Sequence, residues 1–493
     1  MSELAAGAAE PPDGHSWDLL VVGGGTAGLF AARTAAGFGA STLLVERDRL
    51  GGDCLWTGCV PSKALLAAAS AAAEARHAGR LGVNVGGITV DFAAVMAHVR
   101  AAIAAIEPGD SAQALAGAGT RVLHGQVQLT GPATAQVDAR PVRFRQALLA
   151  TGSQPALPPI PGLSDAQPLT SDTVWSLTAQ PERMVVLGGG STGCELGQAF
   201  ARLGSQVSLI EAAPRLLMGE DPDAAGAVTA ALRRDGVTVL TGAAVSAVRS
   251  DGTGGGALEL SGAGQAEFDR LLVAVGRTPR SRDLGLPAAQ VKTDERGYVT
   301  VDDHLRTSNT RLWAAGDITG HPQFTHTAGV HGSLAATNAI LGLRRRAGLA
   351  AMPRVTFTQP EVAAVGAGTG DEARHPGLTA RTVRHEHVDR AVTDGHTEGF
   401  TRLVIDGSGR VLGATVVGPR AGDTLAELVL AVRRGLRTRD LAAATHAYPT
   451  YGYGPWDAAI GDVRDRLRRP IPARVITVLA GGRRRWMDLR GCG

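Results

Sequence analysis

One pattern occurs twice in this chain, and it restricts the fold more than any other feature. The first copy runs from an apolar stretch at residues 17–22 through a glycine-rich loop and a helical stretch to a second apolar stretch that ends at Glu46. The second copy runs in the same order from residues 184–187 to Glu211. Both loops read Gly-x-Gly-x-x-Gly, with their glycines at Gly23, Gly25 and Gly28 and at Gly188, Gly190 and Gly193.

In both copies an acidic residue follows the third glycine by 18 positions. Such glycines let the backbone approach a pyrophosphate, the helix N-terminus attracts its charge, and the acid binds a ribose hydroxyl. A single loop of this kind is weak evidence, because glycine-rich turns without a ligand are common. Two complete strand–loop–helix–strand–acid units predict two dinucleotide-binding domains.

The second informative segment contains Cys54 and Cys59, two of only four cysteines, and is followed by Val-Pro-Ser-Lys63. No other pair completes a zinc site. Beside a dinucleotide-binding loop, the two thiols predict a disulfide that forms and breaks during turnover, and the alternative is two unpaired buried cysteines. Pro61 suits the first turn of a helix, so Cys59 should lie near a helix N-terminus, which favours the thiolate. Residues five apart in a regular helix are too distant to pair, so we expect Gly58 to permit a distorted turn.

Composition excludes several classes of function. The net charge is only +3, which implies no general attraction to nucleic acid. There is no signal-peptide pattern and no apolar run of membrane-spanning length, so we expect a cytoplasmic protein with no membrane partner. Lysine occurs only as Lys63 and Lys292, which makes the lysine of the cysteine segment more notable.

Further strand-plus-glycine segments occur at residues 147–152, 271–277 and 312–317. From about Pro353 the pattern changes to alternating strands, followed by a helix that we expect a Thr424-x-x-Glu427 capping box to open. This change predicts a separate α+β domain.

Together these motifs resemble those of the class I pyridine nucleotide-disulfide oxidoreductases, which include dihydrolipoamide dehydrogenase, glutathione reductase and mercuric reductase. The resemblance runs from about Trp17 to Asp462. It implies an α/β fold with two Rossmann-like domains, which bind FAD and NAD(P), and a C-terminal α+β domain that forms a homodimer. The expected boundaries are a disordered lead at 1–16, an FAD domain at 17–155 and 281–345, an NAD(P) domain at 156–280, an interface domain at 346–468, and an Arg-rich tail at 469–493.

The resemblance also assigns cofactor positions. It implies that FAD is bound by Gly23, Gly25, Gly28, Glu46, Gly52, Gly125, Thr151, Gly152 and Asp317, with the backbone near Thr325 and the Lys63–Glu195 pair at the flavin. It implies that the nicotinamide nucleotide is bound by Gly188, Gly190, Gly193, Glu211 and Gly276. Glu211 favours NAD, because a carboxylate repels the 2′-phosphate of NADP, although Arg215 lies close enough to weaken that preference. No metal cofactor is predicted.

The mechanism implied by the resemblance is a relay in which hydride passes from NAD(P)H to flavin and electrons pass on to a Cys54–Cys59 disulfide. Cys59 would be the thiolate beside the flavin, and Cys54 the thiol facing the substrate. Cys194, behind the second loop, is expected to serve packing alone.

One segment departs from the disulfide-specific members of the family. They carry a catalytic His and a Glu where this chain has Tyr448 and Tyr453. Mercuric reductases carry a tyrosine at the first of these places, and a soft metal ion needs thiolates rather than an acid–base pair. Those enzymes also end in a vicinal cysteine pair, whereas this chain has Cys492 alone.

The leading hypothesis is therefore a mercuric-reductase-like enzyme that reduces a metal ion or a small oxidised compound. The first alternative is a dihydrolipoamide dehydrogenase or low-molecular-weight disulfide reductase in which His446 replaces the missing base. His446 could equally be structural. The second alternative is a flavoprotein that serves as an interaction subunit without turnover, with the Arg-rich tail as its contact.

Overall fold

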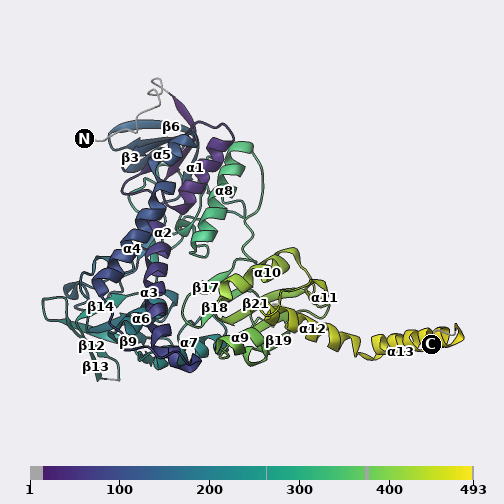
Figure 1. Cartoon of the computed structure of the whole chain (residues 1–493). Helices are drawn as coiled ribbons and strands as arrows, with labels where there is room; N and C mark the ends of the chain where they lie inside the picture. Colours follow the sequence, from purple (N-terminus) through teal and green to yellow (C-terminus); the bar gives the residue numbers. More distant parts are fainter. Residues whose placement is uncertain (1–14, 263, 372–376, 491–493) are drawn as a thin grey trace. The chain divides into compact units, whose positions relative to one another are not determined.

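A computed structural model describes residues 15–262, 264–371 and 377–490. The chain divides into two compact units (Figure 1). The first takes the described residues up to 217 together with 232–349, and the second takes 218–231 and the described residues from 350 onward.

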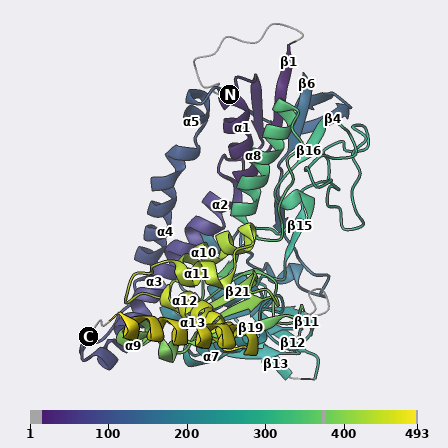
Figure 2. The same ribbon diagram turned by 90° about the vertical axis from the view of Figure 1, so that its right-hand side faces the viewer.

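The first unit contains a sheet in which neighbouring strands are parallel in the order β3-β2-β1-β6, with β3 at one edge, and β16 also pairs with β6 in parallel. Its strands are β1 (Ser16–Val22), β2 (Thr42–Glu46), β3 (Thr120–His124), β4 (Val127–Gly131), β5 (Thr134–Val137), β6 (Arg140–Leu149) and β16 (Leu312–Ala314). Helices α1 (Thr26–Gly37) and α8 (Thr325–Leu341) lie side by side against this sheet (Figure 2). Their alanine-rich inner faces allow this close approach.

A second parallel sheet in the same unit has the order β10-β9-β8-β14. Its strands are β8 (Arg183–Leu187), β9 (Gln206–Glu211), β10 (Thr238–Thr241) and β14 (Arg270–Val273), and α6 (Ser191–Leu203) follows β8. An antiparallel meander adds β11 (Val245–Ser250), β12 (Gly256–Leu260) and β13 (Gly264–Phe268). The ribbon of β7 (Ser153–Pro155) and β15 (Arg277–Pro279) is also antiparallel.

The two sheets confirm the duplicated strand–loop–helix–strand pattern. In both copies a side chain at the third glycine would clash with the backbone. A Cβ on Gly28 would lie 1.8 Å from the carbonyl oxygen of Gly23, and one on Gly193 would lie 1.9 Å from that of Gly188. The helix can therefore begin this close to the preceding strand only with glycine at this position.

The second unit is built on an antiparallel sheet in the order β17-β18-β21-β20-β19. Its strands are β17 (Arg354–Thr356), β18 (Glu361–Gly366), β19 (Thr379–Arg384), β20 (Phe400–Ile405) and β21 (Val411–Gly418). Its helices are α9 (Asp389–Asp394), α10 (Ala421–Arg434), α11 (Thr438–Ala443), α12 (Tyr453–Leu467) and α13 (Pro470–Leu489), with most of α7 (Pro222–Arg234). The core lies between the sheet and the apolar faces of α10 and α12. The predicted α/β fold with a C-terminal α+β part is thus confirmed.

Two details differ from the sequence predictions. The capping box at Thr424 is wrong: α10 begins at Ala421, and the Glu361 carboxylate accepts a hydrogen bond from the backbone N of Gly422 at 3.0 Å. A strand residue distant in sequence thus supplies the acceptor that a local cap would have given. Ser16 belongs to β1 rather than to a disordered lead, and residues 1–14 lie outside the described part.

The Arg-rich tail contains a helix, α13. No helix in the described ranges is long and apolar enough to span a membrane.

Candidate functional site

The two cysteines lie on either side of a break between two helices. Cys54 is in α2 (Gly52–Trp56), and Cys59 is the first residue of α3 (Cys59–His77), as predicted. A Cβ on Gly58 would lie 2.8 Å from the carbonyl oxygen of Asp53, so only glycine fits this turn without a shift. The two cysteines are not joined by a disulfide here, both are partly buried, and the Cys54 thiol donates a hydrogen bond to the Cys59 sulfur.

The surroundings favour a thiolate on Cys59. The hydrogen bond from Cys54, another from Thr325 and the charge of Lys63 outweigh the opposing effect of burial and lower the pKa of Cys59 to about 6. The same hydrogen bond, together with burial, raises the pKa of Cys54. The pair thus has one thiolate and one thiol at neutral pH, which is the arrangement that thiol–disulfide chemistry requires.

Lys63 and Glu195 form the ion pair expected from the sequence. The Nζ of Lys63, on α3, lies 2.7 Å from Oε2 of Glu195, on α6. Glu195 is only 6% exposed, so its charge needs this partner. The pair connects the cysteine helix to the helix of the second glycine-rich loop.

Two threonines complete the immediate surroundings of the thiols. The Thr325 hydroxyl, at the start of α8, lies 3.0 Å from the Sγ of Cys59. The Thr26 hydroxyl, at the start of α1, hydrogen-bonds Cys54. The sequence had indicated only the backbone near Thr325 and no role for Thr26. Both threonines stand at helix starts next to recognised motifs, which is the only local signal they carry.

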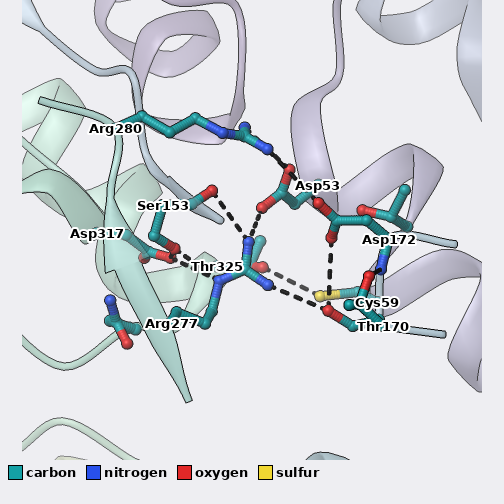
Figure 3. A network of polar contacts seen from close by, with 12 residues as sticks. Asp53, Cys59, Ser153, Thr170, Asp172, Arg277, Arg280, Asp317 and Thr325 are labelled. Carbon is teal, nitrogen blue, oxygen red and sulfur yellow. Dashed lines mark hydrogen bonds and ion pairs between the residues drawn. The ribbon is translucent and has the colours of Figure 1, made fainter. Parts of the chain in front are cut away.

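A network of arginines and aspartates lies beside the cysteines, and the sequence analysis missed it (Figure 3). The Arg277 guanidinium forms an ion pair with Asp53, the residue before Cys54. The Nε of Arg277 also donates to the hydroxyl of Ser153 at 2.6 Å, and that hydroxyl donates to Asp317 at 2.6 Å. The network therefore links the cysteine helix to Asp317.

Arg280 extends this network on its other side. Its guanidinium lies 3.5 Å from the Asp53 carboxylate and 3.6 Å from that of Asp172. Burial is the main cause that raises the pKa of Asp317, and the nearby Asp53 carboxylate adds to it. Arg277 directly follows Gly276 and Arg280 comes three residues later, so their place after the last strand of a nucleotide-binding sheet was the available signal.

The first glycine-rich loop fits a dinucleotide. The Glu46 carboxylate accepts hydrogen bonds from the backbone N atoms of Gly24 at 2.6 Å and Asp48 at 2.8 Å, so it lies at the loop. No described side chain caps the first turn of α1, whose N–H groups are thus available to a phosphate. A Cβ on Gly52 would lie 2.6 Å from the Cα of Gly25, so α2 packs directly on this loop.

The remaining predicted FAD positions surround the same end of the sheet. Gly125 follows β3, and its backbone N donates to the Glu46 carbonyl at 2.9 Å. The Thr151 hydroxyl donates to the Arg280 carbonyl at 2.7 Å, and the Gly152 carbonyl accepts from the Arg280 N at 3.0 Å. Around Gly152 a Cβ would meet no described atom within 4 Å. Thr151 and Gly152 thus hold the segment that carries Arg280.

The second loop repeats the first. Glu211 accepts from the backbone N atoms of Gly189 at 2.6 Å and Ala213 at 2.7 Å. The Arg215 guanidinium donates to the carbonyl oxygens of Leu216 and Leu217. Added Cβ atoms at Gly190 and Gly276 would meet no described atom within 4 Å, which leaves room for a ligand at both glycines.

Tyr448 and His446 belong to the second unit. The Tyr448 side chain is 66% exposed, and its hydroxyl donates to Asp389, which raises the pKa of the phenol. The two ring nitrogens of His446 face the Ala444 carbonyl at 3.1 Å and the Glu427 carboxylate at 2.9 Å. Since both neighbours are acceptors, only a ring that carries both protons donates to each of them.

Two other predictions concern thiols and metals. Cys194 is fully buried, and burial raises its pKa, which agrees with a packing role. Cys492 lies outside the described residues. Across the described ranges, no group of three or more His, Cys, Asp or Glu side chains could hold a metal ion.

Comparisons with known proteins agree with this geometry. A mercuric reductase from Streptomyces lividans is 38% identical over 450 residues, which cover 88% of this chain and 94% of the relative. A dihydrolipoyl dehydrogenase from Chlamydia muridarum is 34% identical, with 88% of this chain and 94% of the relative covered.

Solved structures give the same result. The structure of LpdA from Mycobacterium tuberculosis matches with a TM-score of 0.82 at 27% identity, covering 90% of this chain and 98% of that one. The Cu(II) complex of the HOCl-induced flavoprotein disulfide reductase RclA from Escherichia coli matches with a TM-score of 0.80 at 25% identity, covering 90% and 99%.

The family described as pyridine nucleotide-disulphide oxidoreductase matches residues 17–332, and its dimerisation domain matches residues 352–459. Members of this family are FAD-dependent enzymes that use NAD(P)H, and the dimerisation domain indicates a homodimer. The chain therefore belongs to the pyridine nucleotide-disulphide oxidoreductase family and is a flavin-dependent disulfide oxidoreductase.

Proposed function

We propose that this enzyme uses NADH to reduce a thiol-binding metal ion, with Hg²⁺ or Cu²⁺ as the leading candidates, through Cys54 and Cys59. The observation that carries the proposal is a low pKa at Cys59 without a matching base. At the sequence position where the disulfide-specific members of the family carry a catalytic His, this chain has Tyr448, whose hydroxyl donates a hydrogen bond to Asp389. A phenol whose pKa is raised accepts no proton at neutral pH. A metal ion that binds thiols releases their protons by itself and needs no such base.

We propose that the FAD part of the first unit is formed by residues 17–155 and 281–345, and the nicotinamide part by 156–280. The uncapped start of α1, the Glu46 carboxylate and the open space at Gly152 fit FAD. When bound, FAD supplies the chemistry that accepts hydride from the nicotinamide and delivers the electron pair to the disulfide.

The residues of the chain have separate tasks in this scheme. Reduction of the Cys54–Cys59 disulfide uses one electron pair, breaks the S–S bond, and leaves one thiol and one thiolate at neutral pH. Lys63 and Thr325 hold Cys59 in its charged form. Overall, one NADH reduces one Hg²⁺ to Hg⁰ or two Cu²⁺ to two Cu⁺, with one proton released in either case.

The preference for NADH rests on Glu211. Its carboxylate is fixed at the loop by the backbone of Gly189 and Ala213, where a 2′-phosphate would meet a negative charge. Arg215 donates to two backbone carbonyls of its own turn. These hydrogen bonds hold the guanidinium at its own turn and leave its charge unchanged, so the preference rests on the Glu211 carboxylate.

We assign Tyr448 to substrate binding in the homodimer and His446 to structure. Two similar proteins support a metal substrate: one is a mercuric reductase, and the RclA structure is a Cu(II) complex. The alternative is reduction of lipoamide or a small disulfide. One observation favours it, because His446 and Glu427 form a His–carboxylate pair.

The test is NADH oxidation by the flavin-loaded homodimer with Hg²⁺, Cu²⁺, lipoamide or small disulfides. We expect turnover with a metal ion that Tyr448→Phe reduces and His446→Gln leaves intact. Robust lipoamide turnover that His446→Gln abolishes would establish the alternative instead. A matched measurement with NADPH should give a lower kcat/KM than with NADH.

A further inference from the structure

The C-terminal helix α13 presents an apolar face that no described residue covers. It continues past α12 and away from the sheet of its own unit (Figure 1). None of its residues is buried. Its larger apolar side chains are between 42% and 87% exposed, and they are Ile471, Val475, Ile476, Val478, Leu479, Trp486, Met487 and Leu489.

Most of these side chains share one side of the helix. At 3.6 residues per turn, Ile471, Val475, Val478, Leu479, Trp486 and Leu489 fall within one apolar arc. An amphipathic helix gains most of its stability from covering such an arc. The helix also contains Gly481 and Gly482, which lower its intrinsic stability further. It therefore requires a surface to lie on.

The charged residues that border this arc indicate what kind of surface α13 contacts. Arg474 and Arg485 border the arc on one edge, and Arg483 and Arg490 border it on the other. Within the described residues, none of these four forms an ion pair with a carboxylate. The guanidinium groups of Arg483 and Arg490 lie 4.0 Å and 4.6 Å from the Trp486 ring centroid.

We infer that α13 docks the enzyme on an anionic lipid surface, with the helix parallel to the membrane. Apolar side chains flanked on both sides by arginines, with a tryptophan at the boundary, match the layers of a lipid interface. The arginines then contact lipid phosphates while the arc enters the acyl region. The helix itself does not qualify as a spanning helix. This inference replaces the expectation of no membrane partner and does not depend on the substrate of the thiol pair.

A second copy of the chain fits the face less well. A coiled-coil seam needs apolar residues every seven positions. Ile471 and Val478 keep this spacing, as do Leu479 and Trp486. Seven residues after Val475 and Val478, however, stand Gly482 and Arg485, so the seam is interrupted in the second half of the helix. Two such helices would also bring like charges together.

The experiment is flotation of the full-length, flavin-loaded protein with vesicles of phosphatidylcholine alone or mixed with phosphatidylglycerol. We expect binding to the anionic vesicles only, and weaker binding as salt rises. Val478→Asp should abolish binding. Its matched control, Ala480→Asp, adds the same charge on the opposite face and should leave binding unchanged. Exchange of Arg483, Arg484 and Arg485 for Gln should weaken binding by about 100-fold.

Flavin content and NADH oxidation should be the same in all variants, because α13 carries none of the proposed redox residues. Absence of vesicle binding by the wild type would overturn the inference. Equal binding to neutral vesicles, or binding that Val478→Asp leaves intact, would do so as well. A loss of dimer mass in light scattering with Val478→Asp, without vesicle binding by the wild type, would assign the face to a second copy.

Discussion

The two glycine-rich loops of the first unit are near copies in geometry but differ in what covers them. In both, the acid accepts a hydrogen bond at 2.6 Å from the backbone N of the residue after the first motif glycine, Gly24 or Gly189, and a Cβ on the first motif glycine would lie 2.5 Å from a carbonyl oxygen of a neighbouring segment. In the first copy, α2 packs on Gly25 through Gly52, whereas Gly190 in the second copy has open space. A nucleotide-binding loop thus becomes a redox centre when a cysteine-bearing helix is placed against it.

The turns that follow the acidic residues Glu46 and Glu211 also differ between the two copies. The backbone N of Gly51 donates to the Gly24 carbonyl at 2.9 Å, and that of Leu217 donates to the Gly189 carbonyl at 2.9 Å. Both residues have positive φ angles, 102° for Gly51 and 49° for Leu217. Glycine at the first site lets α2 begin directly, while the second copy has a buried leucine there.

The largest predicted effect separates the cysteines of the two copies. Cys59→Ala should lower metal-dependent NADH oxidation on the order of 10³-fold or more, because the thiolate is lost. Cys194→Ala, the matched change in the second copy, should stay within about twofold of the wild type. Steady-state rates at equal flavin content measure both. Equal losses in the two variants would contradict a role for Cys59 as the reactive thiolate.

The third glycines should separate the two nucleotides. Gly28→Ala and Gly193→Ala each drive a Cβ onto a backbone carbonyl oxygen, at 1.8 Å and 1.9 Å. Each should destabilise its own domain by about 3 kcal/mol or more. Gly28→Ala should be purified without most of its flavin, and Gly193→Ala should keep flavin but show a raised KM for NADH. Full flavin content in Gly28→Ala would show that the first loop does not bind FAD.

Substitution of the acidic residues of the two copies, Glu46 and Glu211, should have smaller effects than substitution of the third glycines. Glu211→Gln should lower the ratio of kcat/KM for NADH over NADPH by about tenfold, because the charge that repels a 2′-phosphate is removed. Glu46→Gln should weaken flavin retention and leave that ratio unchanged. The measurement is the initial rate with each nucleotide. An unchanged ratio in Glu211→Gln would remove the basis for an NADH preference.

The smallest effects concern the proton of Cys59. Its pKa of about 6 predicts that the thiolate of the reduced enzyme is present at pH 7 and is lost as pH falls through 6. Thr325→Val and Lys63→Gln remove interactions that lower this pKa, so both should move the midpoint upward. Thr325→Ser should restore it, and Lys292→Gln is the control at the other lysine. Ultraviolet thiolate absorbance against pH measures the midpoint, and a downward shift in Lys63→Gln would refute the charge effect.

The family resemblance, rather than a local pattern, predicted the Lys63–Glu195 pair, whose members are 132 positions apart. Local patterns predicted the two nucleotide-binding units and the helix start at Cys59, because glycine spacing and strand periodicity act over short distances. They did not predict the network of Asp53, Arg277 and Arg280, which joins segments more than 200 residues apart and carries no motif. The capping box at Thr424 failed for the same reason, since Glu361 supplied the acceptor from a distant strand.

The contact between Thr325 and Cys59 spans 266 positions of the sequence, and this separation has a consequence for biosynthesis. At about 5–20 residues per second, a ribosome needs roughly 13–50 s to make that length of chain. During this interval Cys54 and Cys59 have been synthesised, but α8, which holds Thr325, has not. Until the chain has been made past residue 325, the nascent Cys59 therefore lacks one of the two hydrogen bonds that lower its pKa in the folded enzyme.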